Sequence, residues 1–163
     1  MFLWQKIIAM NSRAIFEKRI RQAVKASTID VRETAQEQHR FTSRTGNLEK
    51  AIDYQISNSG MQGVVFLDID VAKYGPFVHE GTPAHVINPR FKKVLRFVPR
   101  GGNGFVFTRS VFHPGTAPDP FLYDALENNI PNIINIFSQY TGHALDDVAR
   151  GLVKDEYSIT FNI

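Results

Sequence analysis

The chain has 163 residues, of which 43 % are hydrophobic, 21 % are charged and 13 are phenylalanine. This composition is typical of a folded domain and excludes a disordered tail, and the length fits one domain of common size. The absence of cysteine excludes a disulfide scaffold, a thiolate zinc finger, an iron–sulfur site and a cysteine nucleophile. We therefore expect residues 1–163 to form a single domain.

The formal net charge of +3 is unevenly distributed along the chain. Residues 1–50 sum to +5, residues 51–118 to +3 and residues 119–163 to −5. Such polarity favours a protein that meets a negative partner at one end and a positive one at the other, either nucleic acid or an identical neighbour. The alternative is a solvated surface that has no partner.

The N-terminal half predicts one long helix followed by short elements. Apolar residues recur at intervals of three or four over 12–41, which indicates an amphipathic helix with one buried face. The apolar run 1–10 that precedes it is too short and too polar for a signal peptide or a membrane span. The other elements expected in this half are a break at 42–46, a helical segment over 47–56 that changes to strand near Tyr54, a turn at 57–63, a strand over 64–71 and a helical turn over 72–80 that ends at Gly81.

The C-terminal half predicts a hairpin, a helix and a last strand. Two strand-like runs, 94–98 and 105–111, are joined by a glycine-rich tip and form the outer part of an arm over 90–111. The other elements expected here are a loop at 82–89, a loop at 114–118, a helix capped by Asp119 with Pro120 at its first position, a kink or split at Pro131, a helix end at Gly142, a short helix over 145–153 and a half-buried strand over 157–163.

These elements predict an α+β fold. A mostly antiparallel sheet is flanked by the long N-terminal helix and by the helix of the C-terminal half. The β-hairpin arm extends from this body, and residues 143–163 add a C-terminal helix and strand.

Few residues form a pattern that is typical of catalysis. Asp68 and Asp70 lie two apart on the predicted strand, so both would point to one face and could hold a magnesium ion, although the solvent side of a strand has the same pattern. A zinc site from His79, His85 and His113 is conceivable, but these histidines are scattered and none belongs to an HExxH motif. The sequence contains no GxSxG motif.

The most suggestive local feature is a basic stretch on the predicted arm. Basic residues interleaved with phenylalanine attract phosphate groups without regard to sequence and could follow a DNA backbone. The same residues could instead contact an acidic patch of a neighbouring subunit, and residues 119–163 supply such a patch. We favour subunit contact slightly over DNA contact. The basic residues are Arg90, Lys92, Lys93, Arg96, Arg100 and Arg109.

Three segments, taken in order, resemble a known family. They are TGNL at 45–48, YGPFVHEGT at 74–82, and HPGT at 113–116 followed by PDPFL at 118–122. Over residues 12–140 this pattern is similar to the tail-completion or head–tail connector proteins that form the neck of long-tailed bacteriophages. The matched positions are Thr45, Gly46, Leu48, Tyr74, Glu80, Gly81, Thr82, His113, Pro114, Gly115, Pro120 and Phe121.

The resemblance implies a structural virion protein without enzymatic activity, cofactor or membrane contact. It implies a ring of identical subunits, expected to be a hexamer, around the channel through which DNA leaves the head. The ring would contact the head adaptor or stopper and the tail terminator, touch DNA transiently, and assemble in the host cytoplasm. The alternative drawn from the residues is a DNA-binding or metal-dependent DNA-processing protein, whose activity would depend on Asp68 or Arg96.

Overall fold

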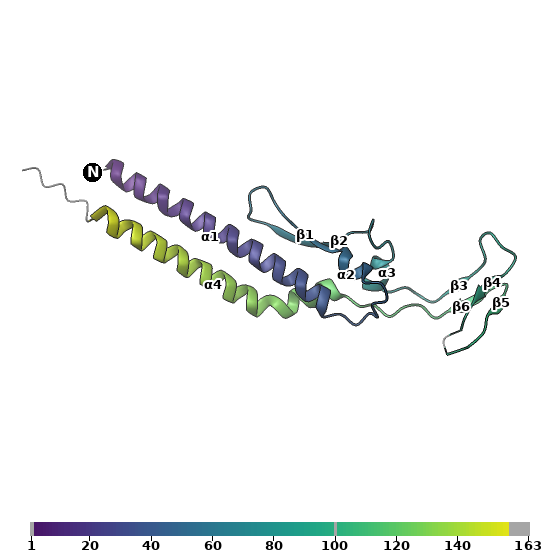
Figure 1. The fold of residues 1–163 in the computed structure, drawn as a ribbon. Helices are drawn as coiled ribbons and strands as arrows, with labels where there is room; N and C mark the ends of the chain where they lie inside the picture. The colour runs from purple at the N-terminus through teal and green to yellow at the C-terminus, as the bar shows by residue number, and fades with distance from the viewer. Residues whose placement is uncertain (1, 100, 157–163) are drawn as a thin grey trace, which may run out of the picture.

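Two long antiparallel helices form the body of the molecule, and a β-ribbon extends from one end of the pair (Figure 1). The computed structural model describes residues 2–99 and 101–156. Helix α1 (Phe2–Glu37) and helix α4 (Phe121–Glu156) contain 36 residues each and lie side by side. Short helices and antiparallel strands lie between them in the sequence, so the predicted α+β class is confirmed.

Helix α1 corrects the predicted bounds of the first helix. The helix predicted over 12–41 spans Phe2–Glu37 instead. Its earlier start agrees with the absence of proline and glycine from the preceding residues, because no helix breaker separates them from the amphipathic stretch. Its earlier end has a tertiary cause. The backbone N–H groups of Arg40 and Phe41 donate to the carboxylate of Asp119 rather than to the preceding turn.

Helix α4 is continuous where the sequence predicts interruptions. Gly142 does not end it, and the short helix predicted over 145–153 belongs to the same element. Pro131 lies inside the helix without splitting it, although the ribbon bends in its N-terminal part (Figure 1). Packing along α1 explains this continuity, because tertiary burial outweighs the roughly 1 kcal/mol that an internal glycine costs. Ala144, two residues after the glycine, is fully buried.

A β-hairpin covers one side of α1. Helix α2 (Asn47–Ala51) leads directly into strand β1 (Ile52–Ile56), which pairs antiparallel with β2 (Gly63–Leu67). The predicted change from helix to strand is confirmed. Gly63 lies so close to Thr28 of α1 that a Cβ atom at this position would overlap the threonine side chain. The hairpin therefore packs closely on α1 at Thr28.

The strand predicted over 64–71 ends at Leu67 because Asp68 begins a turn. The N–H of Asp70 donates to the Asp68 carboxylate at 2.9 Å, and the N–H of Ala72 donates to the Asp68 carbonyl at 3.1 Å. Local side-chain bonds of this kind compete with strand pairing. The turn leads into helix α3 (Gly75–His79), which confirms the helical turn expected before Gly81.

The arm, which we define as residues 83–115, is longer than the predicted hairpin over 90–111. The region predicted as a loop at 82–89 contributes a strand, and the strand predicted over 105–111 divides in two. The division occurs at a turn where the hydroxyl of Thr108 donates to the carbonyl of Ser110. Two antiparallel pairs result: β3 (His85–Ile87) with β6 (Val111–His113), and β4 (Leu95–Phe97) with β5 (Val106–Thr108).

The hydrophobic core lies where the second half of α1, the α2–β1 junction and the start of α4 meet. Its buried members are Val31, Ala35, Leu48, Ala51, Ile52, Ala72, Phe121 and Ala125. Over residues 2–99 and 101–156 the strands form three separate two-stranded ribbons and no continuous sheet. The strand predicted over 157–163 and the side chain of Arg100 lie outside the described residues.

Candidate functional site

The segments that carry the resemblance meet at the base of the arm. Thr82 and Thr116 form an antiparallel bridge, in which the N–H of each residue donates to the carbonyl of the other at 3.0 and 3.1 Å. The N–H of Thr116 also lies 3.0 Å from the Thr82 hydroxyl oxygen. These bonds hold together the two chain segments that enter and leave the arm.

Glycine is required on both sides of this bridge. Gly81 has φ +75° and Gly115 has φ +93°, a region that residues with a Cβ atom rarely adopt. A Cβ atom on Gly81 would lie 2.6 Å from the Thr116 carbonyl oxygen, and one on Gly115 would overlap the backbone of Thr82. The N–H of Gly115 donates to Nδ1 of His113 at 3.1 Å, across Pro114. The matched glycines and histidine therefore shape the base of the arm.

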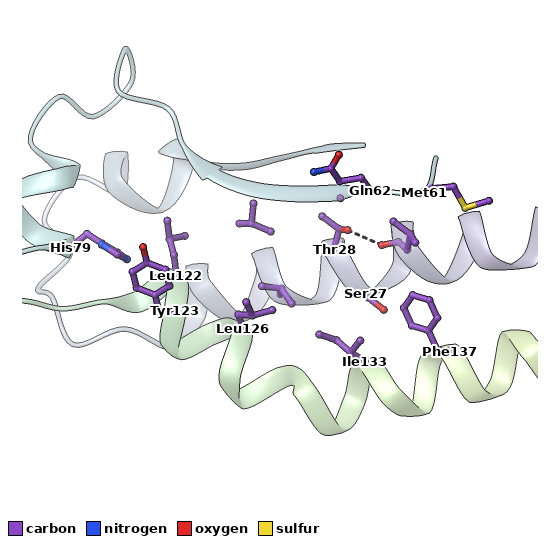
Figure 2. A pocket seen from close by; sticks show the side chains of 14 residues that line it. Ser27, Thr28, Met61, Gln62, His79, Leu122, Tyr123, Leu126, Ile133 and Phe137 are labelled. Carbon is purple, nitrogen blue, oxygen red and sulfur yellow. Dashed lines mark hydrogen bonds between the residues drawn. The ribbon is translucent and has the colours of Figure 1, made fainter. Parts of the chain in front are cut away.

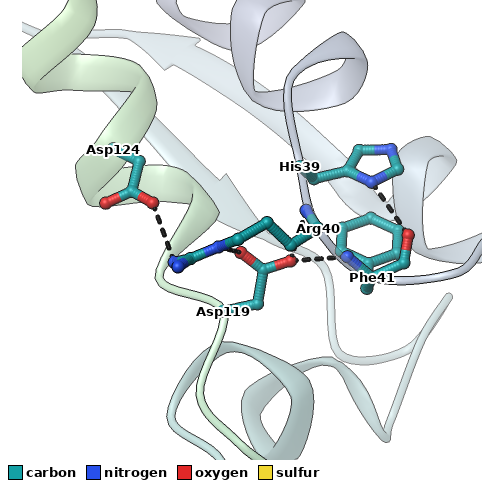
Figure 3. A network of polar contacts seen from close by, with 5 residues as sticks. All are labelled: His39, Arg40, Phe41, Asp119 and Asp124. Atoms are coloured by element: carbon teal, nitrogen blue, oxygen red, sulfur yellow. Dashed lines mark hydrogen bonds and ion pairs between the residues drawn. The ribbon is translucent and has the colours of Figure 1, made fainter.

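A buried carboxylate joins this base to the helix pair (Figure 3). The Asp119 carboxylate accepts the backbone N–H groups of Arg40 and Phe41, both at 2.7 Å, and the Arg40 Nε at 3.2 Å. The Arg40 guanidinium also contacts Asp124 at 3.1 Å. Asp119 therefore does not cap α4 with its side chain as predicted, but fixes the loop after α1 against the start of α4.

Phe121 packs beside the Asp119 contact, and together they form a junction between the arm base and the helix pair. Its side chain is fully buried, and its ring packs edge-on against Phe41 and His79, with centroids 5.3 and 5.1 Å away. Pro120, which precedes it, lies just outside α4 as the structure bounds the helix. These ring contacts therefore connect the loop after α1, helix α3 and the start of α4 at the root of the arm.

The other matched residues lie in or next to α2 and α3. Leu48 is buried in the core, while Gly46 has φ +69° and begins α2. Thr45, Gly46, Leu48 and Tyr74 line one shallow pocket, so two of the matched segments are brought together there. Glu80 is exposed at the end of α3. These positions shape turns and packing.

The described basic residues of the arm have exposed side chains. The Arg96 guanidinium lies 4.3 Å from the centroid of the Phe105 ring, and that of Arg90 lies 5.5 Å from the Phe91 ring. Among the side chains that the structure describes, those of residues 12–99 and 101–151, no ion pair engages an arm cation. The described cations, all on or beside the arm strands, are Arg90, Lys92, Lys93, Arg96 and Arg109.

Some carboxylates of residues 119–163 form ion pairs with arginines of the same chain. Asp119 and Asp124 contact Arg40, and Asp147 contacts Arg19 at 2.6 Å. The hydrogen bond from Arg19 lowers the pKa of Asp147 below its ordinary value. These carboxylates therefore join α4 to α1 and its C-terminal loop.

An open groove of about 590 Å³ runs between β2, α1 and α4 (Figure 2). Its lining is mostly apolar, but Ser27 and His79 each place a buried polar atom there, Oγ and Nε2, without a hydrogen-bond partner in the described structure. The groove was missed by sequence reasoning because its residues come from distant segments. The lining includes Val24, Val31, Met61, Val65, Leu122, Leu126, Ile133 and Phe137.

The two metal-binding arrangements that the sequence allows are not assembled among the described residues. Asp68 follows the end of β2 and Asp70 lies in the turn after it, so the strand geometry that would align their carboxylates is absent. His85 and His113 face each other across a strand pair with ring centroids 5.1 Å apart, whereas His79 packs against Phe121. Within the described chain, no group of three or more acidic or histidine side chains could hold a metal ion.

No family model, curated protein or solved structure matches the chain. Among the helices of the described residues, none is long and apolar enough to cross a membrane.

Proposed function

We propose that the protein is a non-enzymatic structural subunit of the neck of a long-tailed bacteriophage. Copies of it would form a ring, with six subunits by the resemblance, that joins the DNA-filled head to the tail. Its partners would be the head adaptor or stopper on one side and the tail terminator on the other. The subunit would assemble in the host cytoplasm and remain in the virion.

The arm is the observation that carries this proposal. It extends away from the helix pair (Figure 1) and exposes large aromatic side chains, with Phe91 87 % and Phe112 68 % exposed. A two-stranded ribbon alone is at best marginally stable in water, and contiguous exposed apolar surface marks a contact site. A rigid base built from Gly81, Thr82, Gly115 and Thr116 then directs the ribbon toward a neighbour.

Gene inactivation in the phage that encodes the chain tests this function. We expect DNA-filled heads and separate tails to accumulate, because the joining layer is missing, and negative-stain electron microscopy counts both particle types. Supply of the protein in trans should restore complete virions. Normal virions without the protein would refute the proposal.

The basic residues of the arm allow a finer test. Reversal of charge in a Lys92→Glu/Lys93→Glu variant should reduce head–tail joining, because the arm meets an acidic surface or the DNA channel. The control is a Lys50→Glu/Lys73→Glu variant, which alters the net charge equally at exposed positions outside the arm. Equal joining by both variants would remove the arm cations from the interface.

A DNA-binding module is the second candidate, favoured by the charge of the arm. The arm contains six basic residues and no acidic residue. A DNA-binding role predicts binding of duplex DNA that weakens steeply with salt, and loss of this binding on Arg96→Ala substitution. A connector predicts only weak, salt-sensitive contact, because tight phosphate binding would hold back the passing genome. Fluorescence anisotropy at several salt concentrations separates the two.

A further inference from the structure

We infer that the arm of one copy lies in the groove and along the exposed face of α4 of a second copy. This inference rests on the proposed function, because it identifies the surfaces through which ring subunits join. The donor surface is the arm, residues 83–115. The acceptor surface is the groove between β2, α1 and α4, continued by the exposed apolar side chains of α4.

The arm offers enough apolar surface for a stable contact. At about 200 Å² for each phenylalanine, the exposed fractions of its four most exposed phenylalanines correspond to about 550 Å². One side of a standard protein interface buries about 800 Å², so these four rings alone supply more than half of that area. They are Phe91, Phe105, Phe107 and Phe112, which are 87 %, 59 %, 63 % and 68 % exposed.

The acceptor surface also exposes apolar side chains along much of α4. Large side chains on α4 recur at helical spacing and stay at least half exposed, beginning at the groove and continuing toward the C-terminal end of the helix. A second, shallow hollow along this face is lined by α4 residues alone. The exposed side chains of this stripe are Tyr123, Leu126, Ile130, Ile134 and Leu145.

The groove also lies beside a strand that an extended chain would join. Strand β2 contributes lining residues whereas β1, its pairing partner among the described strands, does not. An extended chain in the groove would use its backbone N–H and carbonyl groups to pair with the edge of β2 that β1 leaves free.

Charge complementarity favours the arm over the other apolar surfaces as occupant. The arm is basic and has no carboxylate, whereas α4 has no lysine or arginine before Arg150. Near the groove α4 carries Glu127, next to the lining residue Leu126, and Asp124, which already contacts Arg40. The described part of α1 exposes no large hydrophobic side chain. The exposed apolar residues of 61–77 lie in a segment with two aspartates and one lysine, which does not complement an acidic helix.

The geometry of this contact generates a ring. The donor and acceptor are different surfaces of one chain, so the contact is head-to-tail rather than self-complementary. Such contacts produce closed rings when the rotation between neighbours closes, and filaments when it does not. In Figure 1 the arm points away from the helix pair, so it does not lie in the groove of its own chain.

Cysteine cross-linking tests the contact directly, because the natural chain has no cysteine. A Phe107→Cys variant is mixed with a Leu126→Cys variant that carries a mass tag, and the mixture is oxidised and separated on a non-reducing gel. Both side chains are at least half exposed, so neither substitution removes core packing. The control mixes Phe107→Cys with Glu33→Cys, an exposed position on α1 that does not line the groove.

We expect about tenfold more arm–groove heterodimer than control heterodimer, because a specific contact raises the effective concentration of one thiol near the other. Equal yields from the two mixtures would overturn the inference. A double variant that cross-links within one chain would also overturn it, since the arm would then occupy its own groove.

The neck phenotype separates this inference from the proposed function. If gene inactivation leaves virions intact while the arm–groove heterodimer exceeds the control, the connector function fails and the contact stands. If inactivation separates heads from tails while heterodimer yields are equal, the connector function stands and the arm–groove contact fails.

Discussion

Replacement of Asp119 by alanine should destabilise the contact between the arm base and the helix pair. The carboxylate is 8 % exposed and accepts two backbone N–H groups at 2.7 Å, from Arg40 and Phe41. Alanine leaves both donors without a partner, and each buried donor left unpaired costs about 1–3 kcal/mol. The exposed Arg40 side chain adds little, since it stays solvated. The expected loss is roughly 3–4 kcal/mol.

Thermal unfolding followed by circular dichroism measures this loss. For a chain of this size, 1 kcal/mol shifts Tm by about 2–4 °C, so the Asp119→Ala variant should melt roughly 10 °C below the natural protein. The matched control is Asp124→Ala, which removes the other carboxylate that Arg40 contacts, at a site where the aspartate side chain is 43 % exposed. The control should lose no more than about 1 kcal/mol.

Asp119→Asn supplies a graded comparison. Its amide oxygen still accepts a backbone N–H, so we expect a loss between those of the natural protein and the alanine variant. If Asp119→Ala melts within 2 °C of Asp124→Ala, a difference of about 1 kcal/mol or less, the two backbone hydrogen bonds do not hold the junction and the reasoning fails.

Three further predictions concern the arm base, the core and acid stability. Gly81→Ala should lower the free energy of unfolding, measured in urea, more than Gly46→Ala does. Both glycines have positive φ, but only a Cβ atom on Gly81 would meet backbone atoms. Equal losses would contradict this steric argument. Phe121→Ala should cost about 3–5 kcal/mol by the same assay, because it empties the junction, and a loss below 1 kcal/mol would contradict its burial. The lowered pKa of Asp147 means that its pair with Arg19 stabilises the fold above the ordinary carboxyl pKa of about 4 and is lost as pH falls through the folded-state value. Arg19→Gln should therefore reduce the drop in Tm on acidification, and an unchanged drop would show that the pair contributes nothing.

Local sequence patterns predicted much of the fold. The helical spacing after residue 12, the switch to strand near Tyr54 and the glycine-rich tip between two strand-like runs each correspond to an element of the structure. The turn at Gly81 also agrees with its positive φ. These features depend on side-chain periodicity and backbone conformation within a few residues, which a single sequence contains.

Other predictions failed where a distant partner decided the outcome. Strand β3 forms in a proline-flanked stretch because β6, which follows more than twenty residues later, pairs with it. Helix α4 continues through Gly142 because α1 lies beside it. Asp119 has the residue type of a helix cap, yet the loop after α1 supplies donors that its own helix would otherwise provide.

The sequence by itself determined the class of fold, the basic and cysteine-free arm and the acidic character of α4. Only the tertiary structure decided that Gly81 and Gly115 flank one bridge, that three acidic residues of the C-terminal third pair within the chain, and that a groove opens beside β2. Composition and periodicity are properties of neighbouring residues, whereas a groove and a buried carboxylate are produced by segments that meet only after the chain folds.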